Sequence, residues 1–100
     1  MQDRRRAARK SVDLFFNKHQ DGHPYLCRGL SLSTRGVLAM TYSEPECSDE
    51  TFMVELCLPG DDQPLWLPAR SAWRRNAQHA IEFVELDGEA RERIERYLAA

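Results

Sequence analysis

Over residues 52–58, large aliphatic or aromatic side chains at every second position alternate with Met53, Glu55 and Cys57, the clearest secondary-structure pattern in the chain. The apolar positions are Phe52, Val54, Leu56 and Leu58. Successive side chains of a β-strand point to opposite faces, so a period of two places all four on one face. The pattern predicts a strand buried on one face only, as is typical of antiparallel sheets.

Five further segments have the composition of strands, and polar or Gly/Pro-containing segments separate them. The five ranges are 12–16, 25–32, 36–42, 64–75 and 79–86. We expect turns over residues 17–24, 59–62 and 76–78, and an acidic loop over residues 43–50. Pro68 has no backbone N–H to donate, which predicts an edge position or a bulge in the fifth strand.

The hydrophobic period changes at the end of the chain, where Asp87 is a favourable N-cap for a helix. The apolar residues that follow at helical spacing are Ala90, Ile94, Tyr97 and Leu98. We therefore predict an all-β fold with a C-terminal helix, in three parts. These are a flexible basic arm over residues 1–10, a six-stranded antiparallel β-barrel over residues 11–86, and the helix over residues 87–100.

The overall composition excludes several classes of protein. The 100 residues suffice for one domain with a modest core, and the net charge of −2 disfavours a general nucleic-acid binder. No apolar run approaches the length of a membrane span, and no apolar stretch typical of a signal peptide follows the basic N-terminus. Cys27, Cys47 and Cys57 are odd in number and widely spaced, which is typical of reduced thiols in a cytoplasmic protein.

Positive charge is concentrated near the N-terminus, at Arg4, Arg5, Arg6 and Arg9. Arginine can pair with phosphate, stack on a base, and donate two hydrogen bonds to guanine O6 and N7. A second cluster, residues 31–36 with the sequence SLSTRG, joins the second and third predicted strands. Its small hydroxyl residues and glycine allow a ligand to approach the backbone closely. Together the two clusters predict a guanine-nucleotide pocket on a β scaffold.

In order and spacing these segments resemble the PilZ domain, a bacterial family of cyclic di-GMP receptors. The family has an Arg-x-x-x-Arg segment before its first strand, which Arg5 and Arg9 match. It also has an Asp/Asn-x-Ser-x-x-Gly segment at the corner between its second and third strands, which Ser33 and Gly36 match. The likeness covers nearly the whole chain. Further matches on the later strands are Ala72, Trp73 and Phe83.

The resemblance implies a split-barrel receptor for cyclic di-GMP that performs no catalysis. We expect ligand binding to order the arginine arm against the barrel and to change the surface that a protein partner recognises. The implied ligand contacts are Arg4, Arg5, Arg9, Ser31, Ser33 and Gly36, with Arg6 and Trp73 as candidates at the pocket edge. For Trp73, packing inside the barrel is the stronger expectation, as it is for Trp66 and Tyr25.

Ser31 departs from the family pattern, which has Asp or Asn at this position. A carboxylate can accept hydrogen bonds from both N1–H and N2–H₂ of guanine, and a hydroxyl replaces only part of that contact. The loss predicts binding that is weaker by about 1–3 kcal/mol, or roughly ten- to a hundredfold.

Ser31 also supports an alternative function, that of a PilZ-fold adaptor that binds nucleotide weakly or not at all and acts through protein–protein interaction. A barrel that binds single-stranded nucleic acid would need aromatic residues along a basic groove, which the acidic net charge and the 9% aromatic content disfavour. The histidines and cysteines lack zinc-ligand spacing, and no catalytic set stands out. We therefore expect no metal, no cofactor and no enzymatic activity.

Overall fold

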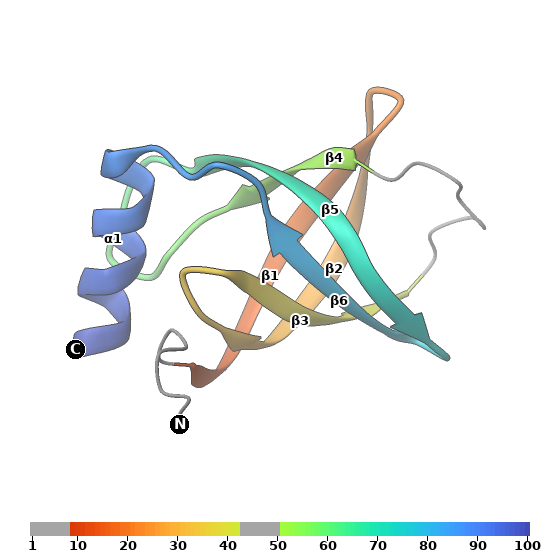
Figure 1. Cartoon of the computed structure of the whole chain (residues 1–100), viewed down its shortest axis with the longest axis horizontal. Helices are drawn as coiled ribbons and strands as arrows, with labels where there is room; N and C mark the ends of the chain where they lie inside the picture. Colours follow the sequence, from red (N-terminus) through yellow and green to blue (C-terminus); the bar gives the residue numbers. More distant parts are fainter. Residues whose placement is uncertain (1–8, 43–50) are drawn as a thin grey trace.

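The computed structural model describes residues 9–42 and 51–100. Within them, six strands close into an antiparallel barrel and one helix follows (Figure 1). The order around the barrel is β1-β2-β3-β6-β5-β4, and pairing of β1 with β4 completes the closure. The predicted six-stranded barrel with a C-terminal helix is confirmed. The elements are β1 (Lys10–Gln20), β2 (His23–Leu32), β3 (Gly36–Thr41), β4 (Thr51–Leu56), β5 (Leu65–Arg75), β6 (Gln78–Phe83) and α1 (Gly88–Ala99).

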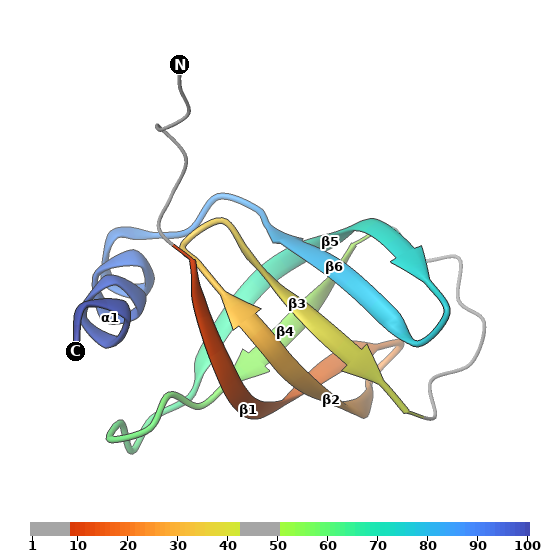
Figure 2. The same ribbon diagram turned by 90° about the horizontal axis from the view of Figure 1, so that it is seen from below.

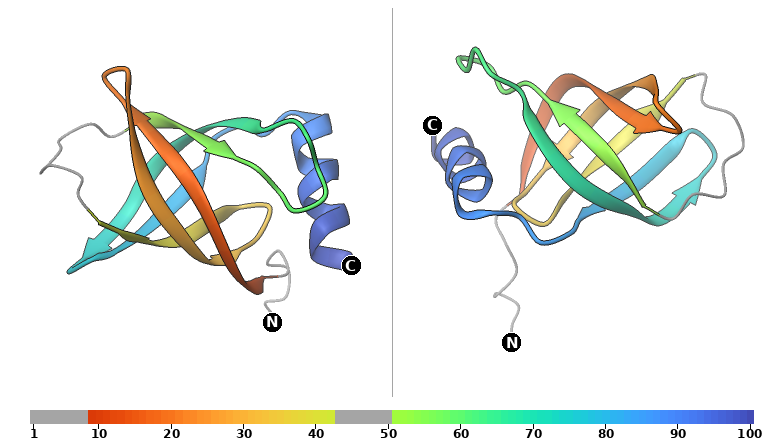
Figure 3. Two further views of the ribbon diagram at one scale, coloured as in Figure 1. Left: turned by 180° about the vertical axis from the view of Figure 1, so that it is seen from behind. Right: turned by 90° about the horizontal axis from the view of Figure 1, so that it is seen from above.

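The strands β1 and β2 form a long hairpin, which lies in front in the left view of Figure 3. Its turn consists of Asp21 and Gly22, whose φ angles of +52° and +80° are those of a type I′ turn. The longer turn predicted over residues 17–24 is therefore wrong. The error arises because the inward positions of β1 are taken by Lys18 and Gln20, which are buried. The strand thus continues without the apolar alternation that would reveal it.

Pro68 occupies neither of its predicted positions. It pairs with Met53 in the β4–β5 ladder, and the bulge that β5 does contain lies at Ala72. The Pro68 carbonyl accepts a hydrogen bond from Val84 N at 2.8 Å, just beyond the last residue of β6. The missing N–H therefore costs at most one hydrogen bond at the end of a ladder, which a closed barrel tolerates.

The hydrophobic core fills the barrel and continues beneath the helix. Strands β1 to β6 contribute their inward-facing residues, and α1 contributes the side that faces the barrel. Burial of this apolar surface is the main favourable contribution to folding. The core residues with at most 1% exposure are Cys27, Leu32, Ala39, Val54, Leu56, Leu67, Ala69 and Ile94.

Helix α1 stands at one end of the barrel, beside the start of β1 (Figures 1 and 2). Asp87 is the N-cap, as predicted, and its Oδ1 accepts from Ala90 N at 2.8 Å. Arg93, whose side chain is 15% exposed, donates to Asp61 Oδ2 from Nε and Nη2 at 3.1 and 2.9 Å. This pair ties the helix to the β4–β5 connection. No helix within the described residues is long and apolar enough to cross a membrane.

Candidate functional site

The corner between β2 and β3 is fixed by its own hydrogen bonds. Ser33 N donates to Gly36 O at 3.0 Å, and Arg35 N donates to Ser33 Oγ at 3.0 Å. The Arg35 carbonyl accepts from Phe83 N of β6 at 2.9 Å, which anchors the corner to the barrel. Ser33 is only 2% exposed, so its hydroxyl lies beneath the surface and supports the corner from within.

Gly36 is required by the close approach of β3 and β6. It pairs with Glu82, and a Cβ at position 36 would overlap the carbonyl oxygen of Ile81 and lie 3.1 Å from Glu82 Cα. These neighbours are backbone atoms of a paired strand, so they cannot move aside as a flexible side chain could. Packing alone therefore demands glycine at this point of the SLSTRG segment.

Two one-residue bulges determine which side chains face outward near this corner. In β2, Gly29 pairs with Ala39 but Ser31 pairs with Leu38, so the extra residue is Leu30. In β5, Ser71 pairs with Ile81 but Trp73 pairs with Ala80, so the extra residue is Ala72. Each bulge reverses the inward–outward alternation of the residues that follow it. Ser31 and Trp73 therefore turn to the outer face of the barrel.

Arg9 is the described arginine of the N-terminal cluster, and it is held at the corner by two serines. Its Nη1 donates to Ser31 Oγ at 3.0 Å and to Ser31 O at 3.3 Å, and its Nη2 donates to Ser33 Oγ at 3.4 Å. Desolvation lowers the pKa of Arg9, yet a guanidinium remains charged in proteins. The fixed positive charge therefore lies directly beside Ser31.

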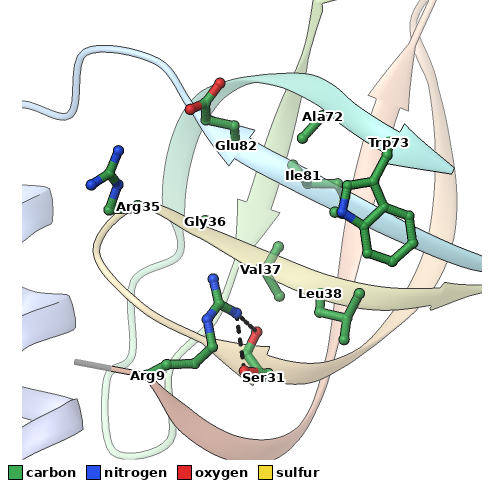
Figure 4. A pocket seen from close by; sticks show the side chains of 11 residues that line it. Arg9, Ser31, Arg35, Gly36, Val37, Leu38, Ala72, Trp73, Ile81 and Glu82 are labelled. Carbon is green, nitrogen blue, oxygen red and sulfur yellow. Dashed lines mark hydrogen bonds between the residues drawn. The ribbon is translucent and has the colours of Figure 1, made fainter. Parts of the chain in front are cut away.

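These residues surround an open pocket of about 310 Å³ on the outer face of β3, β5 and β6 (Figure 4). Arg9 and Trp73 lie on opposite sides of it, and Arg35 stands at the rim. The carboxylate of Glu82 also lines the pocket, but Arg70 Nε donates to its Oε1 at 2.7 Å and offsets its charge. The pocket thus combines two arginines, an indole ring and apolar side chains such as Leu38 and Ala80, a set that suits a flat, anionic ligand.

Comparison with known proteins identifies the family. The model of the PilZ domain matches residues 3–100, which is nearly the whole chain. The chain belongs to the PilZ domain family. Among solved structures, the PilZ domain of YcgR from Escherichia coli, with c-di-GMP, has a TM-score of 0.70 and 18% sequence identity. The match covers 94% of this chain and 88% of that one. No curated protein matches the chain.

The PilZ fold brings some of the predicted site residues together. Arg9, Ser31 and Gly36 line one pocket, whereas Ser33 lies buried beneath it and reaches Arg9 through its hydroxyl. Arg4, Arg5 and Arg6 lie outside the described residues.

The expectation that Trp73 packs inside the barrel is wrong. Trp73 is 46% exposed and lines the pocket, and the Arg75 guanidinium lies 5.6 Å from its ring centroid. Trp66, which was also expected to pack inside the barrel, is 50% exposed, and its ring centroid lies 4.9 Å from that of His19. Sequence analysis did not assign Arg35 to the site, nor four lining residues of the strands, because the outward orientation of those four depends on the bulges and on pairing between distant strands. These residues are Leu38, Ala72, Ala80 and Glu82.

Proposed function

We propose that this PilZ domain is a receptor for cyclic di-GMP and that the ligand binds in the pocket between Arg9 and Trp73. The observation that carries the proposal is the position of Arg9, whose guanidinium is fixed beside the Ser31–Gly36 corner at the edge of an open pocket. The likeness to a PilZ domain solved with c-di-GMP supports the choice of ligand.

Arg9 has the hydrogen-bonding capacity that the role requires. Its three contacts to Ser31 and Ser33 use at most three of the five N–H donors of a guanidinium. The remaining donors can reach guanine O6 and N7 or a phosphate oxygen, and the planar group can stack on a base. Ordering of Arg9 before binding also reduces the entropy lost when the ligand arrives.

The other arginines complete the neutralisation of the two phosphates. Arg35 stands at the rim, and Arg4, Arg5 and Arg6 enter from the N-terminal arm, which orders against the barrel when ligand binds. The ordered arm presents a new surface to a protein partner, and this is how the receptor signals. The domain performs no chemistry on the ligand and acts in the cytoplasm.

The alternative, an adaptor with little or no affinity for nucleotide, is favoured by one residue. Ser31 contacts Arg9 but offers guanine a hydroxyl in place of a carboxylate, which lowers the expected affinity by roughly ten- to a hundredfold. The adaptor would use the same fold and the same faces for protein contact. Measured affinity for cyclic di-GMP separates the two functions.

The test is calorimetric titration of cyclic di-GMP into the purified chain, with GTP as a competitor. Arg9→Ala and Arg5→Ala should each abolish saturable binding. Arg91→Ala, which removes an exposed arginine from α1, is the matched control and should leave the affinity unchanged. Folded protein that gives no binding heat up to high micromolar ligand would refute the receptor and favour the adaptor.

A further inference from the structure

Three polar side chains, those of Lys18, His79 and Ser71, form a hydrogen-bonded series that ends at the β5 bulge. This bulge directs Trp73 to the outer face of the barrel. Ser71, the last residue before this bulge, has its Oγ 2.8 Å from Nε2 of His79 on β6. The other ring nitrogen of His79, Nδ1, lies 3.5 Å from Lys18 Nζ on β1. Lys18 and His79 are both 0% exposed. Strands far apart in the sequence are thus linked at one point behind the pocket wall.

The donors and acceptors of Lys18, His79 and Ser71 give each hydrogen bond between them a direction. A lysine ammonium has three donors and no acceptor, so His79 Nδ1 must accept from Lys18. A neutral imidazole then carries its hydrogen on Nε2, which donates to Ser71 Oγ. The His79 ring is also held by Phe52, whose ring centroid lies 5.9 Å away. Ser71 is therefore bonded to a group that has little freedom to move.

The register of β5 decides where Trp73 points. Inward-facing residues of β6 include His79 and Ile81; Ser71 pairs with Ile81 and, although exposed, has its hydroxyl in contact with His79. Without the extra residue Ala72, Trp73 would pair with His79 and point into the barrel. A slip of one residue would thus remove the indole from the pocket. The bond from Ser71 to His79 opposes that slip because it fixes Ser71 in place just before the bulge.

We propose that Ser71, His79 and Lys18 are positioning residues of the pocket, which hold the β5 bulge so that Trp73 faces the ligand. The effect on ligand affinity rests on the function proposed above. The effect on the orientation of Trp73 does not, because it belongs to the free protein.

The experiment compares Ser71→Ala with Ser71→Thr, which keeps the hydroxyl. Both are made in a Trp66→Phe background, so that Trp73 is the sole tryptophan. Ser71 is exposed, so alanine there leaves the core packed. Leu56→Val, a change in the core on β4, is a control for general destabilisation. For each protein one measures Trp73 emission and acrylamide quenching without ligand, the urea midpoint, and the affinity for cyclic di-GMP.

Ser71→Ala should shift Trp73 emission to the blue, reduce its quenching, and weaken cyclic di-GMP binding roughly 3- to 10-fold, the equivalent of one neutral hydrogen bond. Ser71→Thr and Leu56→Val should keep the parental emission, quenching and affinity. Unchanged emission and quenching in Ser71→Ala would overturn the proposal, as would the same shift in Leu56→Val. If the parent protein does not bind cyclic di-GMP, the proposed function fails, and emission and quenching of the free proteins still decide the role of Ser71.

Discussion

The replacement Ser31→Asp tests whether this pocket reads guanine. Arg9 Nη1 lies 3.0 Å from Ser31 Oγ, so a carboxylate at position 31 is placed to accept a charge-assisted hydrogen bond from the same guanidinium. In the free protein such an exposed pair contributes only about 0.2–1 kcal/mol. In the complex the carboxylate can also accept from guanine N1–H and N2–H₂, a contact that contributes about 1–3 kcal/mol.

One effect opposes this gain, because the new negative charge repels the ligand phosphates. At a separation of roughly 8 Å in water the repulsion is about 0.5 kcal/mol per charge pair, and salt reduces it further. The base contact is the larger effect. The difference is about 0.5–2.5 kcal/mol, so we expect Ser31→Asp to tighten cyclic di-GMP binding by roughly 2- to 60-fold at physiological salt.

The assay is calorimetry on the parent, Ser31→Asp and Ser31→Asn, each titrated with cyclic di-GMP and with cyclic di-AMP. Asparagine has one acceptor and no charge, so it should give a smaller gain than aspartate. The adenine ligand lacks N1–H and N2–H₂ and should gain nothing. Equal or weaker binding of cyclic di-GMP by Ser31→Asp would refute the reasoning, and so would an equal gain for both ligands.

Three further predictions concern the scaffold, and urea denaturation measures each of them. Gly36→Ala should destabilise the barrel by about 1–3 kcal/mol, because its Cβ would overlap the backbone of Ile81; a midpoint equal to that of the parent would show that β3 and β6 separate easily. Asp87→Ala removes the hydrogen bond to Ala90 N and should cost about 1 kcal/mol, whereas Asp87→Asn should cost less. Arg93→Ala breaks the part-buried contacts between α1 and the β4–β5 connection and should cost about 1–3 kcal/mol; a smaller cost for this change than for removal of the exposed Arg96 would contradict the structure.

Local patterns in the sequence were sufficient for most of the fold. The alternation over residues 52–58 appears as β4 together with the buried Leu58, and the capping residue Asp87 begins the helix. The match of the PilZ domain model to residues 3–100 confirms the resemblance seen in the arginine and SLSTRG segments. These features depend on neighbours a few residues apart, so the sequence displays them directly.

The interior of the barrel was less predictable. Lys18 and His79 occupy inward positions that a hydrophobic pattern cannot assign, and their burial is tolerated because each has a hydrogen-bonding partner across the barrel. The full length of β1 was missed for the same reason. A polar residue can face the core when a distant strand supplies its partner, and that partner is not evident from the local sequence.

The candidate site, like the fold, is partly evident from the sequence and partly decided by contacts between distant strands. The sequence by itself indicated that an arginine of the N-terminal cluster, small hydroxyl residues and a glycine belong to one site, and Arg9, Ser31 and Gly36 do line one pocket. Only the tertiary structure decided that Ser31 and Trp73 face the same pocket, because each follows a bulge that reverses the alternation of its strand. A bulge is defined by two residues that oppose one on the paired strand. It is therefore a property of the pair of strands, and neither strand displays it alone.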